Sequence, residues 1–269
     1  MSEDQQERRR RSFDAVAGRY LAARPPYPEA AFELVAERVP PPADVLEVGP
    51  GPGLATLPLA ERGYRIVAVE LGEQLVAEAR RNLAGHHGVR IVQADFEEWQ
   101  PPRPHAFDLL LAASSWHWID PALAYQRAWH ALRHGGWLAL LANHPRPGRK
   151  GTRARRFWDA TDPLYRRYAP ELVRRRGWNP SRLPDVRRQI LDSGRFLTAE
   201  RQVFAWRLDF QPDAYVGLLD TYSDHRTLDA GKRRQLFAAI RRLAAEEFGG
   251  EVPRYYRTVV YLAQTRPAD

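Results

Sequence analysis

The fold is decided by residues 45–53, which read VLEVGPGPG: a short apolar run that ends in three glycines. A strand followed at once by a glycine-rich turn and a helix is the opening unit of the open α/β sheets that bind nucleotide-like ligands. The glycines permit a tight turn and let the backbone approach a bound molecule closely. The segment therefore predicts a strand, a ligand-binding turn and a helix that ends near Glu61.

On both sides of this unit, apolar bursts alternate with helical patterns. Continuous apolar strands separated by helices indicate a mostly parallel sheet covered on both faces, which is an α/β fold. The predicted strands are 64–69, 89–94, 107–113, 137–142, 201–210 and 257–264. The predicted helices are 53–61, 73–83, 121–133 and 229–248, with two more over 13–39 joined by RPPYP and amphipathic stretches between 145 and 193.

Composition excludes several classes of chemistry. The 269 residues include no cysteine, so disulfides, thiolate metal sites and cysteine nucleophiles are excluded. No apolar run approaches the ~20 residues of a membrane helix. The first residues, MSEDQQERRRR, lack the apolar segment of a secretory signal. We expect one large domain with an insertion, in the cytoplasm.

Positive charge is concentrated in one segment. The chain carries a net charge of +8, and residues 145–210 contain 17 Lys or Arg against 7 Asp or Glu. Such a segment is compatible with nucleic acid, a membrane surface or an acidic substrate. It is equally compatible with a solvated, arginine-rich helical face, since only two of the basic residues of the chain are lysines.

An acid stands at the end of each of three successive predicted strands. A carboxylate at Glu47, inside an apolar strand, would repel a pyrophosphate but would suit an ammonium group, which points to the methionine part of S-adenosylmethionine. Glu70 is placed to accept bonds from ribose hydroxyls, and the Asp95-Phe96 pair to contact adenine. A nicotinamide-dependent dehydrogenase could use the same turn and Glu70, but Glu47 and Asp95-Phe96 argue against it.

Several segments resemble the class I S-adenosylmethionine-dependent methyltransferases, in the small-molecule branch (methyltransferase type 11) that contains trans-aconitate methyltransferase-like proteins. They are FDAVAGRYLAARPPYP (13–28), VLEVGPGPG, VAVE (67–70), VQADFEEW (92–99), FDLLLAASSWHWID (107–120), ALRHGGWLALL (131–141), LLDTYSDHR (218–226) and FGGEV (248–252). The resemblance spans most of residues 13–265, with about 145–195 lacking a clear counterpart. It implies a Rossmann-like seven-stranded sheet whose last strand lies antiparallel between the fifth and sixth.

The resemblance also implies a cofactor site for S-adenosyl-L-methionine. Glu47, Gly49 and Gly51 would hold the methionine moiety, and Ser114 would lie beside the cofactor. Glu70 and Leu71 would flank the ribose and adenine, with Asp95 and Phe96 at the adenine. Tyr20 and Arg24 would close over the methionine end, where an arginine suits a carboxylate. Capping of helix carbonyls is an equally good interpretation of Arg24.

The sulfonium already activates the methyl donor, so the protein has to align the acceptor, exclude water and, for a weakly acidic acceptor, take a proton. His117 is a candidate base at neutral pH, although it and Trp118 also fit a purely wall-forming role. Tyr20 is a second catalytic candidate. The residues predicted to bind the substrate are Trp116, His117, Trp118, Tyr222 and His225.

These features divide the chain into a helical segment closing over the cofactor (1–40), a cofactor-binding core (41–144), a basic helical insertion serving as a substrate lid (145–198) and the rest of the core sheet (199–269). We expect transfer to a small-molecule acceptor, a secondary metabolite or organic acid, in a monomer or homo-oligomer with no membrane or nucleic-acid partner. The alternatives are an RNA methyltransferase that uses the insertion and a non-catalytic cofactor-binding protein. No metal site is predicted, with Asn143-His144 left open.

Overall fold

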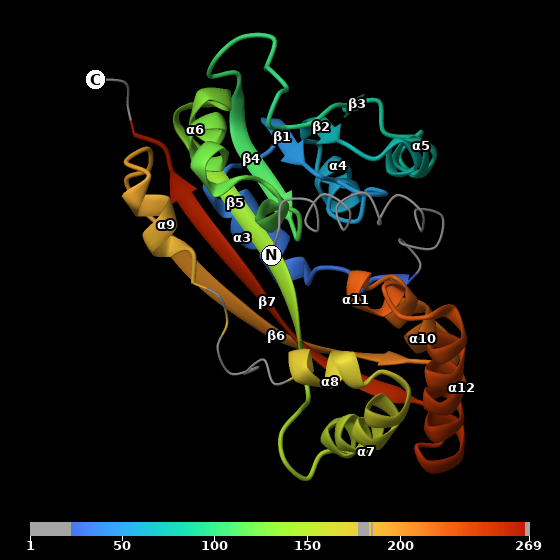
Figure 1. Cartoon of the computed structure of the whole chain (residues 1–269). Helices are drawn as coiled ribbons and strands as arrows, with labels where there is room; N and C mark the ends of the chain where they lie inside the picture. Colours follow the sequence, from blue (N-terminus) through green and yellow to red (C-terminus); the bar gives the residue numbers. More distant parts are fainter. Residues whose placement is uncertain (1–22, 177–182, 184, 267–269) are drawn as a thin grey trace.

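The computed structural model of the chain describes residues 23–176, 183 and 185–266. Within them, seven strands form one sheet in the order β3-β2-β1-β4-β5-β7-β6 (Figure 1). β7 runs antiparallel to both β5 and β6, while the other neighbouring pairs are parallel. The predicted sheet and the predicted place of its last strand are therefore confirmed. The strands are β1 (Asp44–Val48), β2 (Arg65–Glu70), β3 (Val89–Gln93), β4 (Phe107–Ala113), β5 (Leu132–Arg146), β6 (Glu200–Phe210) and β7 (Val252–Gln264).

Helices cover both faces of the sheet, as the apolar strands require. Alternate side chains of β4 enter two separate cores, because successive residues of a strand point to opposite faces. Leu110 packs in the core that contains helix α6 (Pro121–Ala131). Leu109 packs in the core that contains helices α3 (Glu29–Arg38) and α4 (Thr56–Glu61). The remaining elements on this half are α5 (Glu73–Asn82) and the 3-10 turn η2 (Trp116–Trp118).

A third core lies at the far end of the long strands (Figure 1). In this core, helices from the insertion pack on helices near the C-terminus. The insertion contributes Phe157 and Tyr165, and the C-terminal helices contribute Phe237 and Ile240. The sequence predicts helical stretches in this segment, and the structure has helices there; the two that contribute to this core pack on later parts of the chain. The insertion holds α7 (Arg153–Tyr168), α8 (Pro170–Arg176) and α9 (Arg187–Asp192), and the later helices are α10 (Pro212–Asp220), α11 (Ser223–Arg226) and α12 (Ala230–Glu247).

Two strands are longer than the sequence predicts. β5 runs from 132 to 146 instead of 137 to 142, and β7 begins at 252 instead of 257. The cause is pairing with other strands: Arg146 of β5 pairs with Tyr255 of β7, Val252 of β7 pairs with Phe210 of β6, and Leu132 of β5 pairs with Phe107 of β4. Pairing with a distant segment thus extends a strand across a Pro- and Arg-containing stretch that has no strand pattern of its own.

Two further expectations concern the ends of the chain and membranes. The first of the two helices predicted over 13–39 falls largely on residues 1–22, outside the described part, while the second is α3. Among residues 23–176 and 185–266, no helix combines the length and apolar character needed to cross a bilayer.

Candidate functional site

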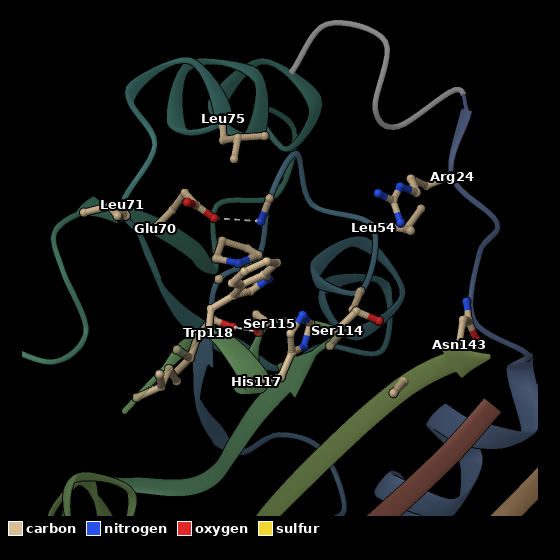
Figure 2. A pocket seen from close by; sticks show the side chains of 18 of the residues that line it. Arg24, Leu54, Glu70, Leu71, Leu75, Ser114, Ser115, His117, Trp118 and Asn143 are labelled. Carbon is tan, nitrogen blue, oxygen red and sulfur yellow. Dashed lines mark hydrogen bonds between the residues drawn. The ribbon is translucent and has the colours of Figure 1, made fainter. Parts of the chain in front are cut away.

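A cavity of about 540 Å³ opens at the carboxyl ends of β1, β2, β4 and β5 (Figure 2). This is the edge at which open α/β sheets bind their ligands. The volume falls within the roughly 300–1,000 Å³ typical of small-molecule sites. The lining residues are Arg24, Tyr27, Val48, Gly49, Pro50, Gly51, Leu54, Ala55, Val69, Glu70, Leu71, Leu75, Ala94, Phe96, Ala113, Ser114, Ser115, His117, Trp118, Ile119, Ala142, Asn143, His144, Tyr222, Ser223 and Asp224.

The glycine turn after β1 forms one wall, and two of its glycines are needed for different reasons. Gly49 has φ +66°, and a Cβ added there would lie 2.6 Å from the Cβ of Ser115, so this position has no room for a side chain. Gly51 has φ +57°, but an added Cβ would meet no protein atom within 4 Å. Because Gly51 lines the cavity, that open space is the space a ligand would take.

Glu70, at the end of β2, is held by one backbone bond from this turn (Figure 2) and by a second from Gly72. Its Oε2 accepts from the N–H of Gly51 at 3.0 Å, and its Oε1 accepts from the N–H of Gly72 at 2.9 Å. The residue is only 8% exposed and lines the cavity. A carboxylate that lines a cavity suits a ligand with paired hydroxyls, because each of its oxygens is a hydrogen-bond acceptor.

Glu47 lies directly behind the wall and not on it. Its side chain is 1% exposed, its neighbours Val48 and Gly49 line the cavity, and neither carboxylate oxygen meets a hydrogen-bond donor among the described residues. Burial raises the pKa of Glu47 to about 8, an effect that the nearby Thr56 hydroxyl opposes and the charge of Glu70 increases. Glu47 is therefore mostly protonated at neutral pH unless a cation approaches it.

This raised pKa predicts a pH-dependent stability. The folded chain keeps a proton on Glu47 that the unfolded chain releases, so the free energy of unfolding should fall as pH rises from about 4.5 to about 8. Glu47→Gln should remove about 2–4 kcal/mol of that fall. Urea unfolding at pH 5.5 and pH 8.5 measures it, with Glu61→Gln, an exposed glutamate at the end of α4, as the control. The prediction would be contradicted if the free energy of unfolding changed equally between the two pH values in wild type and Glu47→Gln.

The opposite side of the cavity carries cationic and neutral nitrogen groups. The Nη2 of Arg24 donates to the carbonyl of Thr221, the C-cap of α10, at 2.9 Å, and the guanidinium lies 4.7 Å from the ring centre of Tyr222. Arg24 thus caps a helix carbonyl and lines the cavity at the same time. Partial burial lowers the pKa of His117, as does the charge of Arg24, and burial likewise lowers the pKa of His144. Both imidazoles are neutral at pH 7.

Most of the residues predicted for the site line this one cavity. They are Arg24, Gly49, Gly51, Glu70, Leu71, Phe96, Ser114, His117, Trp118 and Tyr222. Ser114, at φ 60°, accepts a bond from the Tyr27 hydroxyl at 2.8 Å, and Ser115 donates to the carbonyl of Val48. The structure therefore brings together residues from six separate segments between 24 and 222.

Four predicted residues lie behind the wall and one lies outside the described residues. Glu47 is described above, and Tyr20 falls within 1–22. The Oδ1 of Asp95 accepts from the N–H of Glu97 at 2.9 Å, which orders the turn that carries Phe96. Trp116 packs beside Phe96 and Tyr125, with ring centres 6.3 and 5.6 Å away. His225 is buried next to Asp224.

Six polar residues of the wall are not among the predicted site residues. Tyr27, Ser115, Ser223 and Asp224 are absent from that prediction, and Asn143 and His144 were considered only for a metal. Each is within three residues of a predicted site residue or motif, which is the only signal that the sequence offered. In the part of the chain that the structure describes, no group of three or more His, Asp or Glu side chains is arranged to hold a metal ion.

The described residues of the insertion lie away from the wall of this cavity. None of the described residues between 145 and 198 lines it, and α7 packs on α12 in the third core instead. The elements that border the acceptor-facing side are residues 24–27 and the junction of α10 and α11 at 222–224. A lid role for the insertion stays a prediction.

Comparison with known proteins finds similarity to methyltransferases. Residues 46–140 match a family model described as a methyltransferase domain. An uncharacterized methyltransferase of Mycobacterium tuberculosis is 29% identical over 234 residues, 87% of this chain and 86% of the relative. A solved structure named a type II methyltransferase from Anaeromyxobacter dehalogenans is 26% identical with a TM-score of 0.63, covering 91% of this chain and 99% of that one.

A shorter match concerns RNA. An rRNA adenine N-6-methyltransferase of Saccharopolyspora erythraea is 42% identical over 64 residues, which are 23% of this chain and 17% of the relative. A match of that length covers a fraction of the fold and leaves the acceptor open.

Proposed function

We propose that the chain, as a member of the class I S-adenosylmethionine-dependent methyltransferases, transfers the methyl group of S-adenosylmethionine to a small-molecule acceptor. The observation that carries the proposal is one continuous cavity with two chemically different sides. The cofactor side is formed by Gly49, Gly51, Glu70 and Phe96. The acceptor side is formed by His117, His144, Tyr222 and Asp224, and Arg24 is assigned to the methionine end of the cofactor.

The cofactor side fits S-adenosylmethionine. Glu70 presents a fixed carboxylate for the ribose hydroxyls, and Gly51 leaves open the space beside it. Arg24 offers a guanidinium for the methionine carboxylate. In the described part of the chain, neither oxygen of buried Glu47 has a hydrogen-bond partner, and the ammonium group would supply a charge that favours the ionised form of Glu47. When bound, the cofactor supplies a methyl group made electrophilic by its sulfonium.

The residues of the acceptor side have to align the acceptor with the methyl group, exclude water and remove a proton from the acceptor. His117 is neutral at pH 7 and lines the cavity, so its ring can accept a proton from a hydroxyl or amine. His144 is a second neutral imidazole on the same side. An enclosed space of this size suits an acceptor of metabolite dimensions, such as a secondary metabolite or an organic acid.

Removing the His117 imidazole tests its role as base. His117→Ala is expected to slow transfer about 10²-fold while leaving the affinity for S-adenosylhomocysteine unchanged. In wild type, kcat/KM should rise with pH through the lowered pKa of His117 and level off above that pKa; the variant should lack this rise. Exposed His87, replaced by alanine, is the matched control. Full activity in His117→Ala would reduce the residue to part of the cavity wall.

The acceptor class is tested with labelled cofactor and two competing pools. Tritium from the methyl group of S-adenosylmethionine is followed into a low-molecular-weight bacterial metabolite extract and into total RNA. We expect label in the metabolite fraction and none above background in RNA. Label in RNA, together with RNA affinity that drops steeply between 50 and 200 mM salt, would favour the RNA alternative and overturn the proposal. Binding of S-adenosylhomocysteine without transfer to either pool would favour a non-catalytic protein.

A further inference from the structure

A chain of buried hydrogen bonds leads from the insertion to the acceptor side of the cavity. The Tyr165 hydroxyl, on α7, lies 2.7 Å from Nε2 of His225, and Nδ1 of the same ring lies 2.7 Å from Oδ1 of Asp224. Tyr165 is 3% exposed and His225 6%. Their rings meet edge to face, with centres 5.7 Å apart. The two bonds therefore link three side chains that come from the insertion and from α11.

The direction of the bonds follows from the chemistry of the groups. An ionised carboxylate only accepts, so Nδ1–H of His225 donates to Asp224. In the neutral ring Nε2 is then the acceptor, and the hydroxyl of Tyr165 donates to it. The backbone N–H of His225 donates to the same Oδ1 of Asp224 at 2.8 Å. Two donors from one residue thus hold the Asp224 carboxylate in one orientation.

The far end of the chain is open to the cavity. The Asp224 side chain is 37% exposed, against 7% for His225, and Asp224 lines the acceptor side beside Tyr222 and Ser223. A carboxylate in a partly enclosed wall favours a ligand group that donates a hydrogen bond.

We propose that Asp224 is an acceptor-binding residue that holds a hydroxyl or amine of the substrate, and that His225 and Tyr165 are positioning residues for it. This inference rests on the proposed function and narrows its substrate class to acceptors that carry a hydrogen-bond donor. It also assigns the insertion a role: α7 supplies Tyr165 from a helix packed on α12, and the His225 ring stacks on Phe237 of α12 with centres 6.2 Å apart. The insertion supports the acceptor wall from behind.

The test measures binding of fragments to the protein saturated with S-adenosylhomocysteine. Phenol and 2-phenylethylamine carry a donor, and anisole is phenol without one; affinities come from ligand-observed NMR titration. We expect at least one donor fragment to bind fivefold or more tightly than anisole, and Asp224→Ala to abolish that preference. A preference for phenol alone assigns a hydroxyl, and for the amine alone an amine. Equal binding of all three, or no measurable binding of any, would overturn the inference.

Two tyrosine variants on the same helix separate positioning from general packing. Tyr165→Phe keeps the ring but removes the hydroxyl, and we expect it to reduce the donor preference two- to fivefold and to shift the ¹⁵N resonance of His225 Nε2. Tyr168→Phe, three residues along α7, is expected to change neither. Identical behaviour of the two variants would refute the positioning role.

Affinity for S-adenosylhomocysteine tests the proposed function independently of the role of Asp224. We expect this affinity to be unchanged in Asp224→Ala, Tyr165→Phe and Tyr168→Phe. Failure of the wild type to bind it would defeat the proposed function. Normal binding without a donor preference would defeat only the role of Asp224.

Discussion

Gly51→Ala is expected to weaken the binding of S-adenosylhomocysteine at least tenfold and to destabilise the fold by only about 1–2 kcal/mol. The added methyl group meets no protein atom within 4 Å, so it projects into the cavity, where it takes space from the ligand. The stability cost comes from the left-handed conformation at φ +57°, which disfavours any residue with a Cβ. Calorimetric titration and urea unfolding measure the two effects independently.

The matched control is Gly63→Ala. Gly63 also has positive φ, +87°, and an added Cβ there also meets nothing within 4 Å, but the residue does not line the cavity. It should therefore lose similar stability with no loss of affinity. Equal affinity losses in the two variants, or an unchanged affinity in Gly51→Ala, would show that the space beside Gly51 is not the ligand site.

Glu70→Gln is expected to weaken the binding of S-adenosylhomocysteine about a hundredfold. The wild-type carboxylate accepts two backbone N–H bonds and is placed to accept the ribose hydroxyls. An amide has one acceptor oxygen, so the N–H of Gly51 or of Gly72 would face an NH₂ group and lose its partner. Loss of charge-assisted bonds worth roughly 1.5–3 kcal/mol each supports an effect of this size.

Glu61→Gln supplies the control for Glu70→Gln, since it makes the same chemical change on the surface. It should leave both affinity and stability unaltered. Retention of more than a third of the wild-type affinity in Glu70→Gln would remove Glu70 from the cofactor site. A loss of affinity that is matched by general unfolding in thermal melts would instead assign Glu70 to the turn alone.

Local sequence pattern predicts the sheet well because its central strands are continuous apolar runs buried on both faces. β4 is found at its predicted bounds, 107–113. β5 and β7 are predicted too short, since their outer parts are strands only by pairing with distant segments: Arg146 of β5 pairs with Tyr255 of β7, and Val252 of β7 pairs with Phe210 of β6. The predicted helix to residue 133 ends at Ala131, and β5 begins at Leu132, because Leu132 pairs with Phe107.

The same contrast holds in the site. Gly49, Gly51 and Glu70 follow from a local motif, and the structure places them on the cavity wall. Asp224 and His144 reach the cavity only through tertiary packing of distant segments, which no local pattern encodes. Pairing of Glu47 with the methionine ammonium stays a prediction, since its side chain lies behind the wall.

The most direct test of the central claim is a crystal structure of the chain with S-adenosylhomocysteine. The two sides of the cavity predict the ribose hydroxyls on the Glu70 carboxylate and the sulfur directed toward the acceptor side, between Arg24 and His117. A ligand in the reverse orientation, with its amino acid end at Glu70, or a ligand bound outside this cavity would contradict the account.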